Sequence, residues 1–105
     1  MNLLVYDIFR IFVSMIITKD NINEFIEGTK LYFYNKGITH IEYIPDGITR
    51  LFCHSNRLTE LPKLPESLIH LSCEDNNLPY EITIDNLKQH NKLIKRKLIL
   101  KLICT

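Results

Sequence analysis

Glycine is scarce in this chain, with three residues among 105, and no two of them lie close together. A loop that holds a nucleotide phosphate needs closely spaced glycines, because its backbone N–H groups must approach the phosphate. No such loop and no oxyanion-hole motif can be found in the sequence. We therefore expect no cofactor and no catalytic residues, and we predict that the protein is not an enzyme.

Cysteine is equally sparse, and the three residues, Cys53, Cys73 and Cys104, are widely spaced. An odd number at such spacing is unlike the framework of a small disulfide-rich secreted domain. We therefore expect a reducing, intracellular compartment.

Long apolar runs are also absent. Residues 3–17 are strongly apolar, but they include Asp7, Arg10 and Ser14 and are too short for a membrane span. These three polar residues are three and four apart, so they form one narrow stripe on a helix. We interpret the segment as a helix packed on the end of the domain. A membrane-associated segment, or a chain that really starts at Met15, are the alternatives.

The near-neutral charge of the whole chain conceals an asymmetry. Residues 1–85 carry seven basic and twelve acidic side chains, whereas residues 86–105 carry six basic and no acidic ones. A basic end on an acidic body indicates either internal electrostatic docking or an anionic partner.

A repeat of 20 residues appears when the sequence is compared with itself. Self-similarity at a fixed period of this length is typical of a solenoid. Three coils are visible, at about 28–47, 48–67 and 68–87, and the last degenerates after Leu78. The matching pairs include Leu51 with Leu71, Cys53 with Cys73, Asn56 with Asn76, Ile38 with Leu58, Ile41 with Leu61 and Pro45 with Pro65.

Each coil has a physical interpretation. Leu51 and Cys53 alternate as the buried positions of a short strand. Asn56 follows at the turn, where its amide can satisfy backbone groups of neighbouring coils. Pro62 and Pro65 favour an extended return segment, because proline fixes φ and lacks a backbone donor.

The stretch ITRLFCHSNRLTELPKLPES, followed by LIHLSCEDNNLP, resembles the short leucine-rich repeats of large DNA viruses and, more distantly, those of bacterial effectors. The resemblance covers about residues 28–80, and it departs from the pattern at Lys36, where Asn is expected. It implies an α/β solenoid: a leucine-rich-repeat array of about three coils with parallel strands and an extended convex side. It also implies an intracellular, host-facing role, in the host cytoplasm if the protein is viral. No ubiquitin-ligase activity carries over, because the long C-terminal region of such effectors is absent.

Solenoids expose apolar surface at both ends, so we expect helical caps. Residues 18–28 are predicted to form the N-terminal capping helix, ended by Gly28. A basic C-terminal capping helix is predicted to start with Asp85 as its N-cap. The predicted organisation is therefore an N-terminal apolar segment and capping helix at 1–27, leucine-rich repeats at 28–84 and a capping helix at 85–105.

Cysteine and histidine lie close together at Cys53-His54 and at His70-x-x-Cys73, which are residue types that bind zinc. The repeat places the cysteines inward and the histidines outward, and ligands on opposite sides of a strand cannot share one ion. We therefore expect no metal site, and no Cys–His nucleophile for the same reason.

The outward strand positions form three columns on the predicted concave face, because residues 20 apart lie side by side. Exposed aromatic rings beside Arg and His are typical of protein-binding surfaces. We predict that this face binds another protein, although Tyr32 and Phe52 could instead merely cover each other. The predicted partner-binding residues are Lys30, Arg50 and His70, then Tyr32, Phe52 and Ser72, then Tyr34, His54 and Glu74.

Two other functions remain as alternatives. Residues 3–9 faintly resemble the start of an F-box, which would make the protein a ubiquitin-ligase adaptor. The apolar N-terminus and the basic C-terminus could instead hold the protein on a membrane surface. Our first prediction is a non-enzymatic, monomeric interaction module with a host protein as its partner and no nucleic acid.

Overall fold

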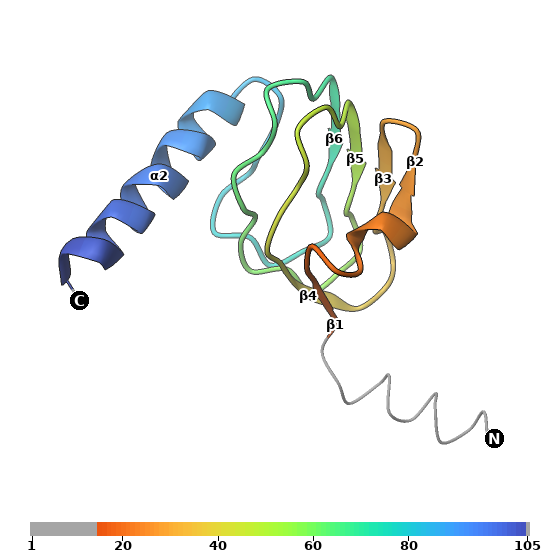
Figure 1. Cartoon of the computed structure of the whole chain (residues 1–105), viewed down its shortest axis with the longest axis horizontal. Helices are drawn as coiled ribbons and strands as arrows, with labels where there is room; N and C mark the ends of the chain where they lie inside the picture. Colours follow the sequence, from red (N-terminus) through yellow and green to blue (C-terminus); the bar gives the residue numbers. More distant parts are fainter. Residues whose placement is uncertain (1–14, 105) are drawn as a thin grey trace, which may run out of the picture.

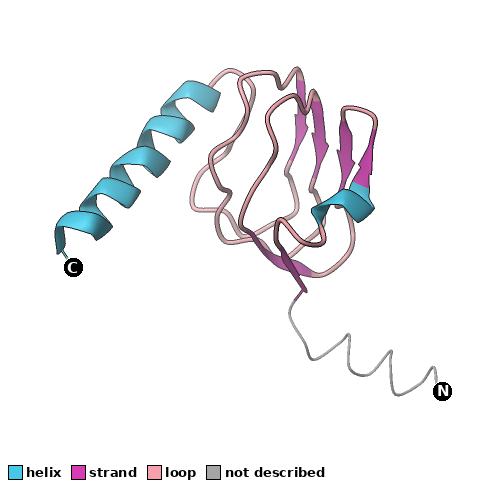
Figure 2. Ribbon diagram, in the orientation of Figure 1, coloured by secondary structure: helices cyan, strands magenta, loops and turns pink. Residues whose placement is uncertain are grey.

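The computed structural model describes residues 15–104 and contains two β-sheets and a C-terminal helix (Figures 1 and 2). A mixed four-stranded sheet has the order β2-β3-β5-β6, and a parallel two-stranded sheet pairs β1 with β4. The elements in chain order are β1 (Met15–Ile17), the 3₁₀ helix η1 (Ile22–Phe25), β2 (Ile26–Glu27), β3 (Lys30–Tyr32), β4 (Ile38–Ile41), β5 (Arg50–Phe52), β6 (His70–Ser72) and α2 (Leu87–Cys104).

The predicted fold class is wrong. We expected an α/β solenoid with an extended convex side and a helical cap at each end. Residues 15–104 instead form a small globule with a mixed sheet, a second parallel sheet and a single α-helix. The second sheet arises because Ile38–Ile41, on the predicted extended side, pairs with Met15–Ile17.

The predicted N-terminal capping helix is also wrong. Its place is taken by η1, one short 3₁₀ helix, and by β2, which pairs antiparallel with β3. The spacing of the apolar residues Ile22, Phe25 and Ile26 is compatible with two structures. One is a helix, and the other is a turn followed by a strand. Gly28, which we interpreted as the end of a helix, has a φ of 64° and lies in the turn between the two strands. That turn reverses the chain, so the segment becomes an edge strand.

Two predictions concern the N-terminal segment, most of which lies outside the described residues. These are the packed helix of residues 3–17 and the F-box-like stretch at 3–9. Of these residues the structure describes only 15–17, which form the strand β1 rather than a helix.

The parallel strands pair with the predicted offset of 20 residues. Lys30 lies opposite Arg50 and Arg50 opposite His70, and the same offset relates Leu31, Leu51 and Leu71. The inward positions of successive repeats therefore stack into one core. Its buried pairs at this spacing are Leu31 with Leu51, Phe33 with Cys53, Cys53 with Cys73, Ile38 with Leu58, Ile41 with Leu61, Ile44 with Leu64 and Ile48 with Leu68.

The asparagines of the repeat join successive turns, as predicted. The Oδ1 atom of Asn56 accepts hydrogen bonds from the backbone N–H groups of Lys36 (3.0 Å) and Ile38 (3.1 Å). Its Nδ2 atom donates to the carbonyl oxygens of Phe33 (2.8 Å) and Cys53 (2.9 Å). Asn76 repeats this one turn later: its Oδ1 accepts from Leu58 N–H, and its Nδ2 donates to the carbonyls of Cys53, Cys73 and Glu74.

The first turn of α2 is attached to the body through its polar side chains. His90 is 1% exposed, and its Nε2 atom lies 2.8 Å from the carbonyl oxygen of Pro62. A carbonyl only accepts, so Nε2 carries the proton and Nδ1 accepts from the hydroxyl of Tyr80 at 2.6 Å. Asn91 bonds both the N–H and the C=O of Leu64 at 2.8 Å. These contacts fix the helix against the segment that carries Pro62 and Leu64.

The start of α2 differs by one residue from the prediction. The helix begins at Leu87, directly after Asn86 rather than after Asp85. Asn86 and Thr83 exchange side-chain to backbone hydrogen bonds, with Thr83 N–H donating to Asn86 Oδ1 and Asn86 N–H donating to Thr83 Oγ1. The amide of Asn86 therefore orders the turn that leads into the helix.

The far part of α2 extends away from the body (Figure 1). Leu102 is 79% exposed and Ile103 is 73% exposed. The helix therefore does not cover an apolar end of the domain, as a cap would.

We predict that Asn56→Ala lowers the free energy of unfolding by about 2–4 kcal/mol, because it leaves several part-buried backbone groups without a partner. Chemical denaturation of the variant measures this loss. Asn77→Ala is the matched control, because the hydrogen bond from Asn77 to Leu58 uses its backbone N–H. Equal stability of the two variants would contradict the role given to Asn56.

We also predict that the protein loses stability in mild acid through His90. Burial lowers the pKa of His90 below its ordinary value of 6.5; the hydrogen bond to Pro62 opposes this effect, and Lys97 adds to it. The unfolded chain therefore binds a proton more readily than the folded one. This contribution to stability is complete above pH 6.5 and is lost as the pH falls toward the lowered pKa.

Thermal unfolding at about pH 7 and about pH 5.5 measures the effect. The difference in Tm between the two conditions should shrink in His90→Gln, while His40→Gln should retain it. An unchanged difference in His90→Gln would show that His90 does not cause the acid sensitivity.

Candidate functional site

The outer face of the four-stranded sheet brings together all nine residues of the three predicted columns. Strand pairing places the side chains of Lys30, Arg50 and His70 in one row and those of Tyr32, Phe52 and Ser72 in the next. The ladder continues beyond the strands, because Asn35 N–H bonds to His54 C=O and Ser55 N–H bonds to Glu74 C=O. These bonds keep Tyr34, His54 and Glu74 in register as the third row. We name these nine residues the aromatic face.

Four rings on the aromatic face stack in two parallel pairs. Tyr32 stacks on Phe52 with ring centroids 5.2 Å apart and ring planes 3° apart. Tyr34 stacks on His54 with the same separation and angle. Tyr32 and Tyr34 also meet edge to face at 6.5 Å, which links the two pairs. Such contacts between rings hold each side chain in one orientation.

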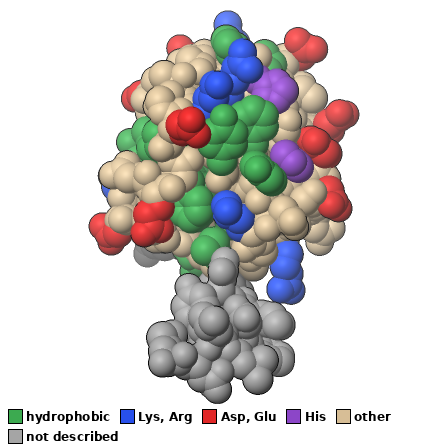
Figure 3. All heavy atoms as spheres, turned by 90° about the vertical axis from the view of Figure 1, so that its right-hand side faces the viewer, with side chains coloured by type: hydrophobic (Ala, Val, Ile, Leu, Met, Phe, Trp, Pro, Cys, Tyr) green, Lys and Arg blue, Asp and Glu red, His purple; other side chains and the backbone are tan. Residues whose placement is uncertain are grey.

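Stacking covers the flat sides of these rings without removing them from the surface. Tyr34 is exposed, whereas Tyr32, Phe52 and His54 are half-buried. Figure 3 views the molecule from the side of the sheet and shows hydrophobic side chains gathered there, with basic and histidine side chains beside them. The aromatic residues therefore do cover one another, and they still form an accessible apolar surface.

One side of this apolar surface carries the basic row. Lys30, Arg50 and His70 are all exposed. The ring of His70 lies 5.0 Å from that of Phe52, and its Nε2 atom is 3.0 Å from the hydroxyl of Ser72. Glu74 is the single carboxylate among the nine residues, and it lies in the row farthest from this basic row. The aromatic face thus combines apolar contact area with positive charge along one edge.

A hollow of about 480 Å³ adjoins the aromatic face, and no sequence pattern indicated it. It lies where the turn of η1 and β2 meets Tyr32 and Tyr34, and its other walls are Glu24, Phe25, Ile26, Glu27, Asn35 and Lys36. The hollow depends on the antiparallel pairing of β2, a segment for which the sequence predicted a helix. It extends the available surface toward two carboxylates.

The cysteines lie on the opposite face of the sheet from the histidines. Cys53 and Cys73 are buried free thiols, and the Cys73 thiol donates to the carbonyl of Ile82 at 3.2 Å. Burial raises the pKa of both thiols. Such thiols are poor nucleophiles at neutral pH, because the thiolate is the reactive form. Within residues 15–104, no group of three or more His, Cys, Asp or Glu side chains is arranged to hold a metal ion.

His54 has a feature that the repeat pattern could not reveal. Its Nδ1 atom is buried and has no hydrogen-bond partner among residues 15–104. The ring is held by stacking on Tyr34 rather than by a polar contact at this atom.

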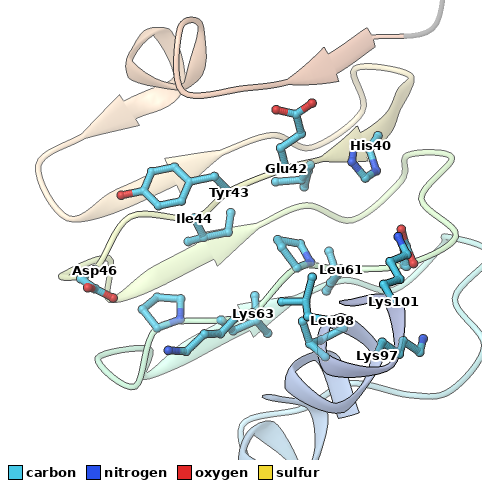
Figure 4. Close-up of a pocket in the computed structure, with 16 residues that line it drawn as sticks. His40, Glu42, Tyr43, Ile44, Asp46, Leu61, Lys63, Lys97, Leu98 and Lys101 are labelled. Carbon is cyan, nitrogen blue, oxygen red and sulfur yellow. The ribbon is translucent and has the colours of Figure 1, made fainter. Parts of the chain in front are cut away.

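A second concavity lies on the other side of the molecule, between α2 and the segments that carry Tyr43 and Leu61 (Figure 4). It is an open groove of about 730 Å³. No sequence motif indicated it, because it arises from the angle at which α2 leaves the body.

The described part of the chain contains no helix that is both long and apolar enough to cross a membrane.

We predict that the thiols of Cys53 and Cys73 resist alkylation in the native protein and react once it is unfolded, because both are buried. Mass spectrometry of peptides after brief iodoacetamide treatment, with and without denaturant, measures this. The unfolded sample of the same protein is the control for intrinsic reactivity. Rapid native labelling of either residue would contradict the described burial.

Comparison of the chain with protein-family models, with curated proteins and with solved structures found no match.

Proposed function

We propose that the protein is a non-enzymatic interaction module that binds another protein through the aromatic face. The observation that supports this most strongly is the pair of ring stacks at the surface, Tyr32 on Phe52 within the adjacent strands β3 and β5 and Tyr34 on His54 just beyond their ends. Large apolar side chains gathered on a surface mark interaction sites more often than scattered ones do.

The order imposed on these rings favours binding further. Each ring is already fixed by its neighbours, so a partner need not immobilise flexible side chains. Aromatic and arginine residues near the centre of an interface commonly carry most of the binding energy. Phe52 and Arg50 occupy this position, since each has a neighbouring strand on both sides.

The charge of the aromatic face indicates what kind of surface its partner should have. Lys30, Arg50 and His70 line one edge, so the partner surface should carry acidic groups there and apolar groups opposite the rings. We further propose that the partner is a host-cell protein in an intracellular compartment. This part of the proposal is supported by the sequence resemblance alone.

The test is affinity capture from cell extract with quantitative mass spectrometry, using the full chain and the double variant Arg50→Ala with Phe52→Ala. We expect at least one protein captured by the native chain to fall by about tenfold or more with the variant, which corresponds to a loss of at least ~1.4 kcal/mol.

Tyr43→Ala is the matched control, because Tyr43 is an exposed aromatic residue on the groove side of the molecule. It should capture the same protein as the native chain. If all three proteins have the same circular dichroism spectrum and the same captured set, the aromatic face is not the binding surface.

A further inference from the structure

The hollow beside the aromatic face has two aromatic walls that stand nearly at a right angle. Tyr32 and Tyr34 both line it, and their ring planes are 78° apart. Phe52 and His54 cover these rings from the side of β5. The hollow lies on the opposite side of β3, where η1 and β2 supply its other walls. It therefore adjoins the sides of the two tyrosine rings that the stacks leave uncovered.

The walls of the hollow carry more negative than positive charge. Glu24 and Glu27 are both exposed there, and Lys36 is the one basic side chain among the described residues that line it. The ammonium group of Lys36 lies 5.7 Å from the ring centroid of Phe25, so it is placed over a third aromatic ring. One further positive charge would balance the two carboxylates.

Aromatic rings and carboxylates attract the same kind of ligand. The face of a ring carries the negative part of its quadrupole, so it attracts a cation that lies within about 6 Å of the centroid. The contact of Lys36 with Phe25 is one such interaction, made within the chain itself. Carboxylates beside the rings add to the attraction, because they contribute charge of the same sign. The hollow combines both groups, so a cation is the ligand that fits its chemistry.

The angle between the two tyrosine rings favours one kind of cation. A guanidinium group is planar and stacks flat on a single ring, whereas an ammonium group is compact and presents its charge in every direction. With ring planes 78° apart, an ammonium group can contact both rings at once. A flat group can stack on one of them alone.

We propose that the hollow receives the ammonium head of a lysine side chain, plain or methylated, from the partner that binds the aromatic face. That the ligand belongs to a protein rests on the proposed function. Lys30, which lies opposite Glu27 in the strand pair, belongs to the basic row and faces the partner's acidic groups. The partner then carries a lysine on the β2 side of the rings and carboxylates along the basic row. This pattern of opposite charges fixes its orientation on the face.

The test is titration of the full chain with small probes, followed by NMR of the ring protons of Tyr32 and Tyr34. The probes are lysine, trimethyllysine and arginine, each with an acetylated amino end and a methylamide at the carboxyl end. A fourth probe is the neutral isostere of trimethyllysine, in which carbon replaces the quaternary nitrogen. We expect saturable shifts with trimethyllysine, and a dissociation constant at least about fivefold higher for the neutral isostere.

The other probes identify the source of the ammonium group. Binding of both lysine and trimethyllysine supports a plain lysine as the ligand, and binding of trimethyllysine alone supports a methylated one. Three results overturn the proposal: no saturable shift with either ammonium probe, equal affinity for the neutral isostere, or tighter binding of the arginine probe.

Variants locate the site. Glu24→Gln with Glu27→Gln should raise the dissociation constant of trimethyllysine by at least about fivefold. Glu60→Gln with Glu66→Gln is the matched control, because it changes the net charge equally at two exposed residues and Glu60 lines the groove beside α2 instead. Lys36→Gln should act in the opposite direction and tighten binding, since it removes a like charge from the hollow. Equal effects of the two glutamine pairs, or weaker binding to Lys36→Gln, overturn the proposal.

These titrations contain no partner protein, so their result is independent of the capture experiment. Saturable binding of trimethyllysine together with capture that ignores Arg50 and Phe52 would refute the protein-binding role of the aromatic face and leave the ammonium site standing. Absence of probe binding together with capture that depends on both residues would refute the lysine site alone. All of the substituted glutamates and Lys36 are exposed, so each variant should keep the native circular dichroism spectrum.

Discussion

The side-chain amides of Asn56 and Asn76 are the constraint on which the rest of the structure depends. Each amide bonds to backbone groups of its own turn and of the preceding one, so it fixes the register between two chain segments about 20 residues apart. This register determines how β3 pairs with β5 and how β5 pairs with β6. The buried core and the aromatic face are the two sides of this one register, so a slip in it would disturb both.

The features that depend on the 20-residue period were predictable from the sequence. Because the period determines which residues lie side by side, it correctly placed Cys53 and Cys73 inward and Tyr32 and Phe52 outward on paired strands. Periodicity also identified the asparagines as the residues that join successive turns. It could do so because each repeat contacts mainly its neighbours, so that local spacing determines the contacts.

Elements outside the repeat were predicted poorly, for reasons that concern particular residues. The apolar residues before Gly28 fit a helix, but the antiparallel pairing with β3 satisfies their backbone as a strand. In the sequence, His90 is an ordinary polar residue of a helix. Its burial, and its role in joining α2 to the body, depend on the positions of Tyr80 and Pro62, to which it is hydrogen-bonded. The groove depends on the direction of α2, which is a property of tertiary packing and not of any motif.

The two edges of the mixed sheet differ, so the parallel series of strands can be continued at one edge but not at the other. At one edge, β2 runs antiparallel to β3, so the parallel series ends there. At the other edge, β6 is parallel to its neighbour, and within the described residues it pairs with a strand on one side alone. An additional 20-residue unit could therefore continue the same hydrogen-bonding pattern after β6, but not before β2. In evolution or in engineering, such a chain would lengthen from its C-terminal side, where the point of insertion would be the segment between Ser72 and α2.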